Sequence, residues 1–388
     1  MTPHNGFVSA LPPLVEPAAE LTPGEAARYS RHLLLPGLGA EGQRRLKNAR
    51  VLVVGAGGLG SPALLYLAAA GVGTLGIVDF DVVEESNLQR QIIHGSSDVG
   101  RLKVDSARDA VLELNPLVRV RLHPQRLEPE NAVDLFGDYD LIVDGADNFA
   151  TRYLVNDAAV LAGKPYVWGS IYQFSGQASV FWEAAPDGRG VNYRDLYPEP
   201  PRAGTVPSCA EGGVLGVLCA SIASVMGTEA IKLITGIGES LLGRLLIYDA
   251  LQMSYRTITV RKDPSAPPIT GLVDYGALCE LPSDTDPGIT PAELRDLLDS
   301  GAAVALIDVR EPAEWEINRI AGAQLIPKSV LEPGLLPEGR IPVLYCKSGT
   351  RSAQAVAALK RAGVDDVLHL RGGIVAWAQQ FEPDMAGY

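Results

Sequence analysis

The stretch RVLVVGAGGLGSPALLYLAAAG, residues 50–71, decides the fold of the first part of the chain. Its first six residues are an apolar, β-branched run that predicts a buried strand, and residues 61–71 predict a helix. A G-x-G-x-x-G pattern lies between them and contains Gly55, Gly57, Gly58 and Gly60. Glycines at such a turn let the backbone approach a phosphate group, which the N–H groups at the helix start then bind. The stretch therefore predicts a nucleotide-binding turn.

The alternation of strand and helix continues after this turn. Further strand-like runs, separated by helical segments, cover residues 74–81, 139–147 and 164–170. Strands that alternate with helices form a parallel sheet with helices on both faces. Three later runs are typical of antiparallel strands added to such a sheet and cover residues 177–183, 244–250 and 256–262. The fold class predicted for this part is α/β, a Rossmann-like domain with a mixed sheet.

A chain of 388 residues is long enough for two or three domains. Residues 263–287 are rich in Pro, Gly and Asp, which is typical of a linker. Helix-like and strand-like segments then alternate again to the C-terminus. We expect four parts: a flexible N-terminal tail (1–20), a large α/β domain (21–262), the linker (263–287) and a smaller α/β domain (288–388).

Composition and charge exclude several classes of protein. The formal net charge of −13 argues against nucleic acid as the main partner, because a phosphate backbone requires a basic surface. The four cysteines are scattered and form no CxxC pair: Cys209, Cys219, Cys279 and Cys346. Neither a disulfide framework nor a cysteine zinc site is indicated, so we expect reduced thiols in the cytoplasm.

Membrane association is not expected either. Residues 1–20 contain no Lys or Arg ahead of an apolar run and do not read as a signal peptide. Residues 212–234 are largely apolar but carry Ser221, Ser224, Thr228, Glu229 and Lys232. We interpret them as a buried helix in a core or a subunit interface, not as a membrane span.

Polar residues around the predicted nucleotide turn indicate which chemistry it serves. Asp79 ends the next strand, where an acid can accept hydrogen bonds from ribose hydroxyls, but the glycines and Asp79 alone fit NAD as well as ATP. Cationic and carboxylate side chains at the same edge favour attack on a phosphate, because cations offset its charge and a carboxylate can hold Mg²⁺. The candidates are Asn87, Arg90, Gln91, Lys103, Asp147 and Asn148. We therefore predict an ATP site that uses Mg²⁺.

Several motifs together resemble the MoeB/ThiF-type, E1-like adenylating enzymes over residues 21–262, in the form fused to a rhodanese domain. They are RYSRHLLLPGLGAEGQ, DFDVVEESNLQRQ, DGADNFATRYLVND and SCAEGGVLGVL, together with the glycine-rich stretch. The resemblance implies adenylation of the C-terminal glycine of a small ubiquitin-fold sulfur-carrier protein that ends in Gly-Gly.

The resemblance also assigns residue roles. It places Gly58 in the nucleotide loop, Asp79 at the ribose, and Asn87, Arg90 and Lys103 at the phosphates, with Asp147 as the magnesium-linked acid. It implies that Arg31 enters the site of a neighbouring subunit, and hence a homodimer.

One departure from the family concerns zinc. Relatives carry two CxxC pairs that hold a structural zinc, but this chain reads Asn192-Tyr193-Arg194-Asp195 at the first place and has no cysteine at the second. We therefore predict no zinc site. The resemblance places Cys209 on a loop near the adenylate, where it either forms an acyl or persulfide link or is a spectator thiol. Cys219, inside the apolar helix, is interpreted as a core residue.

A second site is predicted where an apolar strand meets a helix in IPVLYCKSGTRSAQAVAALKRAG. The loop after Cys346 can wrap its N–H groups around the sulfur, and nearby cations favour an anionic sulfur or a persulfide. The loop residues are Lys347, Ser348, Gly349, Thr350, Arg351 and Ser352. Phosphatases use a C-x₅-R loop, which is one residue longer than the interval from Cys346 to Arg351.

Residues 288–381 resemble single rhodanese domains around this loop, and a cysteine in it indicates an active sulfurtransferase. The histidine usual in the family is replaced within Asn318-Arg319-Ile320-Ala321, which we expect to alter surface chemistry and not the loop. Asp308 and Arg310 are expected to hold the fold together, and Trp377 to lie in the core.

The two sites suggest one reaction sequence: ATP activates the carrier's carboxylate, and a persulfide on Cys346 converts it to a thiocarboxylate. The sulfur donor would be thiosulfate or a cysteine desulfurase. Molybdenum cofactor, thiamine and cysteine biosynthesis are all compatible destinations. Three alternatives remain at this point: activation of a tRNA carboxylate, a Rossmann oxidoreductase with a fused rhodanese, and a non-catalytic adaptor dimer.

Overall fold

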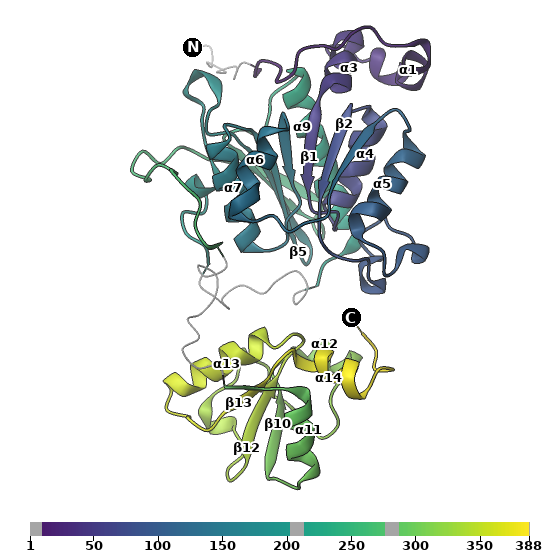
Figure 1. Cartoon of the computed structure of the whole chain (residues 1–388). Coiled ribbons are helices and arrows are strands. Elements are labelled where there is room, and N and C mark those ends of the chain that lie inside the picture. Colours follow the sequence, from purple (N-terminus) through teal and green to yellow (C-terminus); the bar gives the residue numbers. More distant parts are fainter. Residues whose placement is uncertain (1–9, 202–212, 276–286, 388) are drawn as a thin grey trace. The chain divides into compact units, whose positions relative to one another are not determined.

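The computed structural model describes residues 10–201, 213–275 and 287–387 and divides the chain into two compact units, Met1–Cys279 and Glu280–Tyr388 (Figure 1). The first unit is built on an eight-stranded sheet in the order β3-β2-β1-β4-β5-β6-β7-β8. The first five strands in this order run parallel, and β6, β7 and β8 are added antiparallel. The strands are β1 (Arg50–Val54), β2 (Thr74–Val78), β3 (Arg119–His123), β4 (Leu141–Asp144), β5 (Tyr166–Tyr172), β6 (Ser175–Phe181), β7 (Arg244–Asp249) and β8 (Ser254–Thr259).

Helices cover both faces of this sheet, because the central strands bury the side chains of both faces. In β1, Val51 and Val53 join one apolar cluster with α4 and α9, while Leu52 and Val54 join a second cluster with α6 and α7. The predicted Rossmann-like mixed sheet is confirmed. The helices are α1 (Pro23–Arg28), α2 (Ser30–Leu33), α3 (Gly39–Asn48), α4 (Gly60–Ala70), α5 (Lys103–Leu114), α6 (Pro129–Gly137), α7 (Phe149–Leu161) and α9 (Gly216–Thr235).

The apolar helix α9 packs inside the first unit against α4, β5 and β6. By length and composition alone it is apolar enough to cross a membrane. Its residues Leu218, Ile222, Met226 and Leu233 are nevertheless buried in the same cluster as β1. These contacts bear out the interpretation as a core helix.

The described part of the predicted flexible tail is packed. Leu11 and Val15 are buried, the Leu14 N–H donates to the Leu233 carbonyl at 3.0 Å, and Arg45 donates to the Val15 carbonyl at 2.6 Å. The proline-rich composition of residues 10–20 obscures these apolar anchors, which find their partners only on α3 and α9.

Residues 263–275, which the composition assigns to a linker, also pack on the first unit. Tyr275 is buried and donates from its hydroxyl to Asp157 at 2.7 Å, and Leu272 packs against the α6–α7 side of the core. Asp157 in turn receives two hydrogen bonds from Arg194, at 2.9 and 2.7 Å. We call residues 272–275 the strap, because they run along the first unit before the segment that leads to the second.

A polar network also holds the region at which the resemblance places the zinc-binding cysteines of the family. The Asp195 carboxylate, at the end of the 3₁₀ turn Tyr193–Asp195, accepts from the N–H groups of Asn192 at 2.8 Å and Asp263 at 3.0 Å. Lys262 and Asn192 both donate to Glu183, with distances of 2.6 to 2.7 Å. No cluster of three metal-binding side chains occurs among the residues that the structure describes.

The second unit is a five-stranded parallel sheet in the order β11-β10-β12-β13-β9. One face packs against α13 and the other against α11 and α14, where Trp377 is 2% exposed. The elements are β9 (Gly288–Ile289), α11 (Pro291–Asp299), β10 (Val304–Asp308), α12 (Pro312–Ile317), β11 (Gln324–Leu325), β12 (Ile341–Tyr345), α13 (Thr350–Arg361), β13 (Leu368–Leu370) and α14 (Gly373–Phe381).

Candidate active sites

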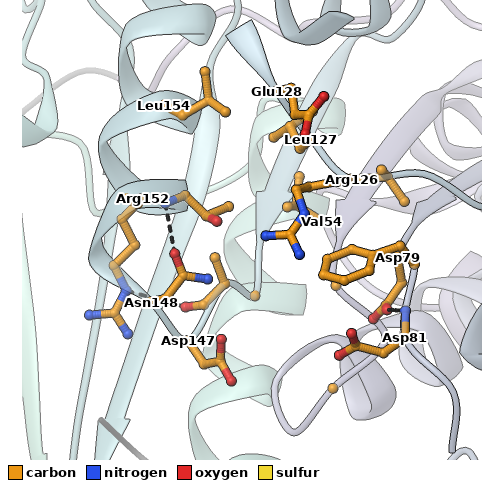
Figure 2. Close-up of a pocket in the computed structure, with 18 of the residues that line it drawn as sticks. Val54, Asp79, Asp81, Arg126, Leu127, Glu128, Asp147, Asn148, Arg152 and Leu154 are labelled. Atoms are coloured by element: carbon orange, nitrogen blue, oxygen red, sulfur yellow. Dashed lines mark hydrogen bonds between the residues drawn. The ribbon is translucent and has the colours of Figure 1, made fainter. Parts of the chain in front are cut away.

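A cavity of about 950 Å³ lies in the first unit at the carboxyl ends of β1, β2 and β4 (Figure 2). Within the sheet, β2 is the neighbour of β1 toward one edge and β4 is its neighbour toward the other edge. The order in which the chain adds strands therefore reverses at β1. Open α/β sheets bind ligands at such a reversal. The cavity lining includes most of the residues predicted for the nucleotide: Gly55, Gly57, Gly58, Asp79, Arg90, Gln91, Lys103, Asp147 and Asn148.

The glycines at the first turn are required by close contacts. Gly55 has a φ of +86°, in the left-handed region that favours glycine. A Cβ on Gly60 would lie 1.8 Å from the Gly55 carbonyl oxygen, and one on Gly58 would lie 3.0 Å from the Cys219 sulfur. The buried Cys219 therefore packs directly beneath the nucleotide turn. Any larger residue at Gly60 would force the turn open.

Two side chains fix the backbone on either side of Ala56, in the middle of this turn. Its N–H donates to Asp79 Oδ2 at 2.8 Å, and its carbonyl oxygen lies 3.0 Å from His94 Nε2. His94 also contacts the Ser106 hydroxyl on α5 at 2.8 Å, and burial lowers its pKa, which favours the neutral ring. The nucleotide turn is thus tied both to the end of β2 and to α5.

Asp79 and Lys103 face each other across the end of β2. Burial raises the pKa of Asp79, while the charge of Lys103 and hydrogen bonds from the N–H groups of Ala56 and Asp81 lower it. Lys103, at the first position of α5, is buried and donates from Nζ to Asp81 Oδ2 at 3.0 Å. A carboxylate suited to sugar hydroxyls therefore lies beside a buried cation.

The polar segment after Asp79 is only partly in the cavity. Arg90 lines it and donates from Nη1 to the Ser86 carbonyl at 2.9 Å. Gln91 is buried, and its Oε1 has no hydrogen-bond partner among the described residues. Asn87 does not line the cavity, because its side chain bonds within the turn to the Glu84 N–H at 3.3 Å and to Ser86. Gly60 is likewise outside the lining.

Asp147 lies on the opposite side of the cavity from Asp79 and Asp81 (Figure 2). Its carboxylate is exposed and has no hydrogen bond or ion pair within the described part of the chain. Magnesium at nucleotide sites is held by one or two carboxylates together with phosphate oxygens, so this free carboxylate fits the ion. Asn148 caps α7 and accepts from the Thr151 N–H at 2.9 Å.

One predicted residue lies elsewhere, and another is outside the described residues. Arg31 is exposed on α2 and does not line this cavity. Cys209 falls in residues 202–212, outside the described residues.

Sequence reasoning missed several lining residues. Arg126 stacks over the Phe80 ring at 4.2 Å. Leu127 and Leu154 also line the cavity, Leu154 from the side of α7 (Figure 2). The strap forms another part of the wall. Residues 125–130 carry no motif, and the contact of the strap depends on a partner 118 residues away in sequence, so neither gave a local signal. Arg152, by contrast, lies inside the quoted DGADNFATRYLVND motif and was given no role.

In the second unit, Cys346 follows β12 and is fully buried. Its sulfur accepts from the Gly349 N–H at 3.2 Å and lies 3.7 Å from the Ser352 hydroxyl. Gly349 has a φ of +95°, and its absent Cβ would be 3.0 Å from the Gly372 nitrogen. The loop therefore curls around the sulfur as predicted and is backed by α14, whose Ile374 N–H donates to the Cys346 carbonyl at 2.8 Å.

Arg351 does not act as the free cation expected beside the sulfur. Both of its terminal nitrogens donate to the buried Glu314 carboxylate, at 2.6 and 2.7 Å. A paired guanidinium contributes little net charge to its surroundings, so backbone and hydroxyl donors provide the contacts to the sulfur that the structure shows.

Asp308 and Arg310 form a fully buried pair, with Nη2 2.6 Å from Oδ2. Arg310 also donates to the Asn318 side chain and carbonyl, both at 2.8 Å. Asn318, expected to affect surface chemistry only, thus completes the buried network, because Arg310 has more donors than Asp308 can accept.

Comparison with known proteins identifies both units. Residues 29–268 match the ThiF family, and residues 290–380 match the rhodanese-like domain. The chain is 71% identical over 390 residues to the probable adenylyltransferase/sulfurtransferase MoeZ of Mycobacterium tuberculosis, which covers 98% of this chain and 100% of that protein. It is 54% identical over 268 residues to the sulfur carrier protein adenylyltransferase of Thermus thermophilus, covering 67% of this chain and 98% of that protein.

Among solved structures, E. coli MccB with ATP matches with a TM-score of 0.53 at 22% identity, covering 62% of this chain and 73% of that one. At this identity the likeness concerns the fold alone. The relative from M. tuberculosis, in contrast, spans both units and confirms the resemblance drawn from the motifs. The chain belongs to the ThiF family, in the form that carries a rhodanese-like domain at its C-terminal end.

Proposed function

We propose that this chain adenylates a small ubiquitin-fold sulfur-carrier protein at its C-terminal Gly-Gly and then transfers sulfur to it from Cys346. The observation that carries the proposal is the presence of two dissimilar sites in one chain. A phosphate-compatible cavity has Arg90, Lys103 and Asp147 in its lining, and a cysteine lies in a loop of N–H and hydroxyl donors. A relative that is 71% identical along nearly the whole chain is named for both activities.

In the first step, a carboxylate oxygen of the carrier attacks the α-phosphorus of ATP and pyrophosphate leaves. Arg90 and Lys103 would offset the charge that builds on the phosphates, and the N–H groups of the glycine turn would bind them. Magnesium, when bound at Asp147, supplies further neutralisation of the phosphate oxygens. Phe80, Leu127 and Leu154 offer an apolar and aromatic wall suited to a nucleobase. The product is a carrier acyl-adenylate.

In the second step, Cys346 carries a persulfide whose outer sulfur attacks the acyl carbon, and AMP leaves. The resulting acyl disulfide is cleaved when a thiolate attacks the Cys346 sulfur, which releases the thiocarboxylate and leaves a disulfide that a thiol reductant must reopen. We propose Cys209 as that thiolate. Thiosulfate or a cysteine desulfurase would restore the persulfide.

The remaining assignments are part of the same proposal. Gln91 and Asn148 would contact the nucleotide from the cavity wall, and Asn87 would act from the turn behind it. Arg31 would complete the site of a second subunit, since it lies outside the cavity of its own chain. The two-site chemistry and the named relatives favour a protein carrier over a tRNA carboxylate or a nicotinamide substrate.

A reciprocal pair of variants tests the proposal. A Gly-Gly carrier incubated with the protein, Mg-ATP and thiosulfate should gain the mass expected when sulfur replaces one oxygen. Cys346→Ser should keep carrier-dependent ATP–pyrophosphate exchange and lose the mass gain, whereas Asp147→Asn should lose exchange and keep sulfur transfer from thiosulfate to cyanide. If neither the wild type nor any variant catalyses exchange with a Gly-Gly carrier, the proposal is wrong.

A further inference from the structure

Asp147 has the free carboxylate of the first site, yet nothing holds its side chain in place. It makes no hydrogen bond or ion pair within the described residues. Its position must therefore be set by the backbone of the turn between β4 and α7. Preorganised sites hold their reacting groups to fractions of an ångström, so this turn requires support of its own.

That support comes from two side chains that bind the backbone of one residue, Ala146, through the two peptide groups on either side of it. The Ala146 N–H, immediately before Asp147, donates to Asp144 Oδ1 at 2.9 Å. The Ala146 carbonyl accepts from Arg152 Nε at 3.2 Å. The N–H of Gly145 donates to the Val54 carbonyl of β1 at 3.0 Å, which ties the same turn to the nucleotide turn. The peptide groups before and after Ala146 are thus both fixed from the protein interior.

The two gripping residues are deeply buried, and their burial is costly. Asp144 is completely buried and Arg152 is 6% exposed. Asp144 Oδ2 has no partner among the described residues, nor has Nε1 of Trp168, the residue beside it on β5. The Arg152 guanidinium lies 5.9 Å from the Trp168 ring and 5.4 Å from that of Phe149. Apolar residues of similar size would avoid these costs, so a purely structural role explains the arrangement poorly.

We propose that Asp144 and Arg152 are positioning residues that fix the two peptide groups flanking Ala146 and thereby hold the Asp147 carboxylate where it binds the magnesium of the nucleotide. The inference rests on the proposed adenylation. It adds to the Asp147 carboxylate, which would bind the ion, two buried residues that act on the ion only through Asp147. Groups that orient a metal ligand commonly contribute about 10- to 100-fold to metal affinity.

The test measures binding, not turnover, with the full-length protein. Titration calorimetry with a non-hydrolysable ATP analogue, at a series of magnesium concentrations, gives the gain in nucleotide affinity that magnesium provides. Arg152→Lys keeps the charge but cannot present Nε to the Ala146 carbonyl in the same geometry. We expect Arg152→Lys to need about tenfold more magnesium than the wild type for the same gain in affinity for the nucleotide analogue. Tyr153→Phe, which loses the 3.0 Å bond to the Tyr197 carbonyl from the next position of α7, should bind magnesium as the wild type does.

A double variant separates positioning from general damage. If Arg152 acts through Asp147, Arg152→Lys should cause no further loss of the magnesium gain in an Asp147→Asn background. Equal losses in both backgrounds, or a loss of affinity that is the same with and without magnesium, would overturn the proposal. Should Arg152→Lys fold poorly, Asp144→Val removes the hydrogen bond from the Ala146 N–H instead, and the same loss of the magnesium gain is expected. A wild type without any magnesium-dependent binding would refute the proposed adenylation itself, whereas a normal wild type with an unaffected Arg152→Lys refutes the positioning role alone.

Discussion

The buried carboxyl of Asp144 makes the stability of the first unit depend on pH. Burial raises the pKa of Asp144 to about 7, although the Ala146 N–H and Arg152 both lower it. Asp144→Asn is the informative perturbation, because asparagine has nearly the same shape, keeps the oxygen that accepts from Ala146 and carries no titratable proton. The variant therefore removes the titration and little else.

The sign of the effect follows from proton linkage. The unfolded chain has the ordinary aspartate pKa of 3.8, so between about pH 4 and 7 the folded state binds more protons than the unfolded state. Stability contributed by this group is therefore greatest at low pH and falls as pH rises through this window. A shift of this size corresponds to roughly 4 kcal/mol over the whole window, on the order of 1.4 kcal/mol for each pH unit. Above pH 7 the loss is complete.

Urea unfolding at several pH values between 5.5 and 8.5 measures the effect. The transition of the first unit is identified as the one that an ATP analogue shifts to higher urea, since a ligand stabilises only the unit that binds it. The wild type and Asp144→Asn should diverge as pH rises, with the variant gaining relative stability until about pH 7 and then running parallel. Comparing the two proteins at each pH cancels the contributions that other groups make to the pH dependence of stability. His94 and His123, whose pKa values burial lowers, are two such groups. Curves that stay parallel across the range would refute the reasoning.

Three further predictions concern other contacts. Glu314→Gln breaks the buried pair with Arg351 and should lower the free energy of unfolding of the second unit by about 3–5 kcal/mol. Calorimetry should then show a fall in melting temperature of roughly 10 °C or more. The control Glu316→Gln, at an exposed position of the same helix, should change that free energy by less than about 0.5 kcal/mol. Tyr275→Phe removes the hydrogen bond to Asp157, and limited proteolysis followed by mass spectrometry should show faster cleavage within residues 263–275. Metal analysis by mass spectrometry should find far less than one zinc per chain, and stoichiometric zinc would contradict the interpretation of the missing cysteines.

The parts of the fold that sequence patterns predicted are those specified locally. β1, the glycine turn and α4 follow from apolar β-branched residues, contacts that exclude a Cβ, and a helix that ends at Gly71 with a φ of +83°. In contrast, β3 (Arg119–His123) was not predicted. It alternates charged and apolar residues at the sheet edge and none of its residues is fully buried, so the apolar run typical of a parallel strand is absent.

The candidate sites were predictable to the extent that chemistry and motif coincide. Arg90, Lys103 and Asp147 occur in recognisable segments, and the structure places all three in one cavity. The pairing of Arg351 with Glu314 could not be read from the sequence, because the two residues are 37 positions apart and either one alone looks like an ordinary charge. Such long-range pairs decide which charges remain available to a ligand, and only the packed structure reveals them.

The network around Asp195 offers a way to hold the segment after β8 if, as the missing cysteines predict, no zinc is bound there. It joins the turn after Asn192 to the backbone of Asp263, the two regions at which the resemblance places the cysteine pairs of relatives. Hydrogen bonds to charged groups contribute about 1.5–3 kcal/mol each, much less than the roughly 10–16 kcal/mol of a structural zinc. This network alone is therefore a weaker attachment than a structural zinc would be.

Packing of the strap makes up part of that difference. Leu272 packs into the core and Tyr275 bonds to Asp157, so the segment is fastened again farther along the chain. The strap also lines the cavity. This second attachment therefore makes part of the segment between the two units a wall of the proposed nucleotide site. A metal clip would fix only the region around the clip. Two weaker attachments fix a longer stretch, and they make the shape of that wall depend on hydrogen bonds and ion pairs spread along it.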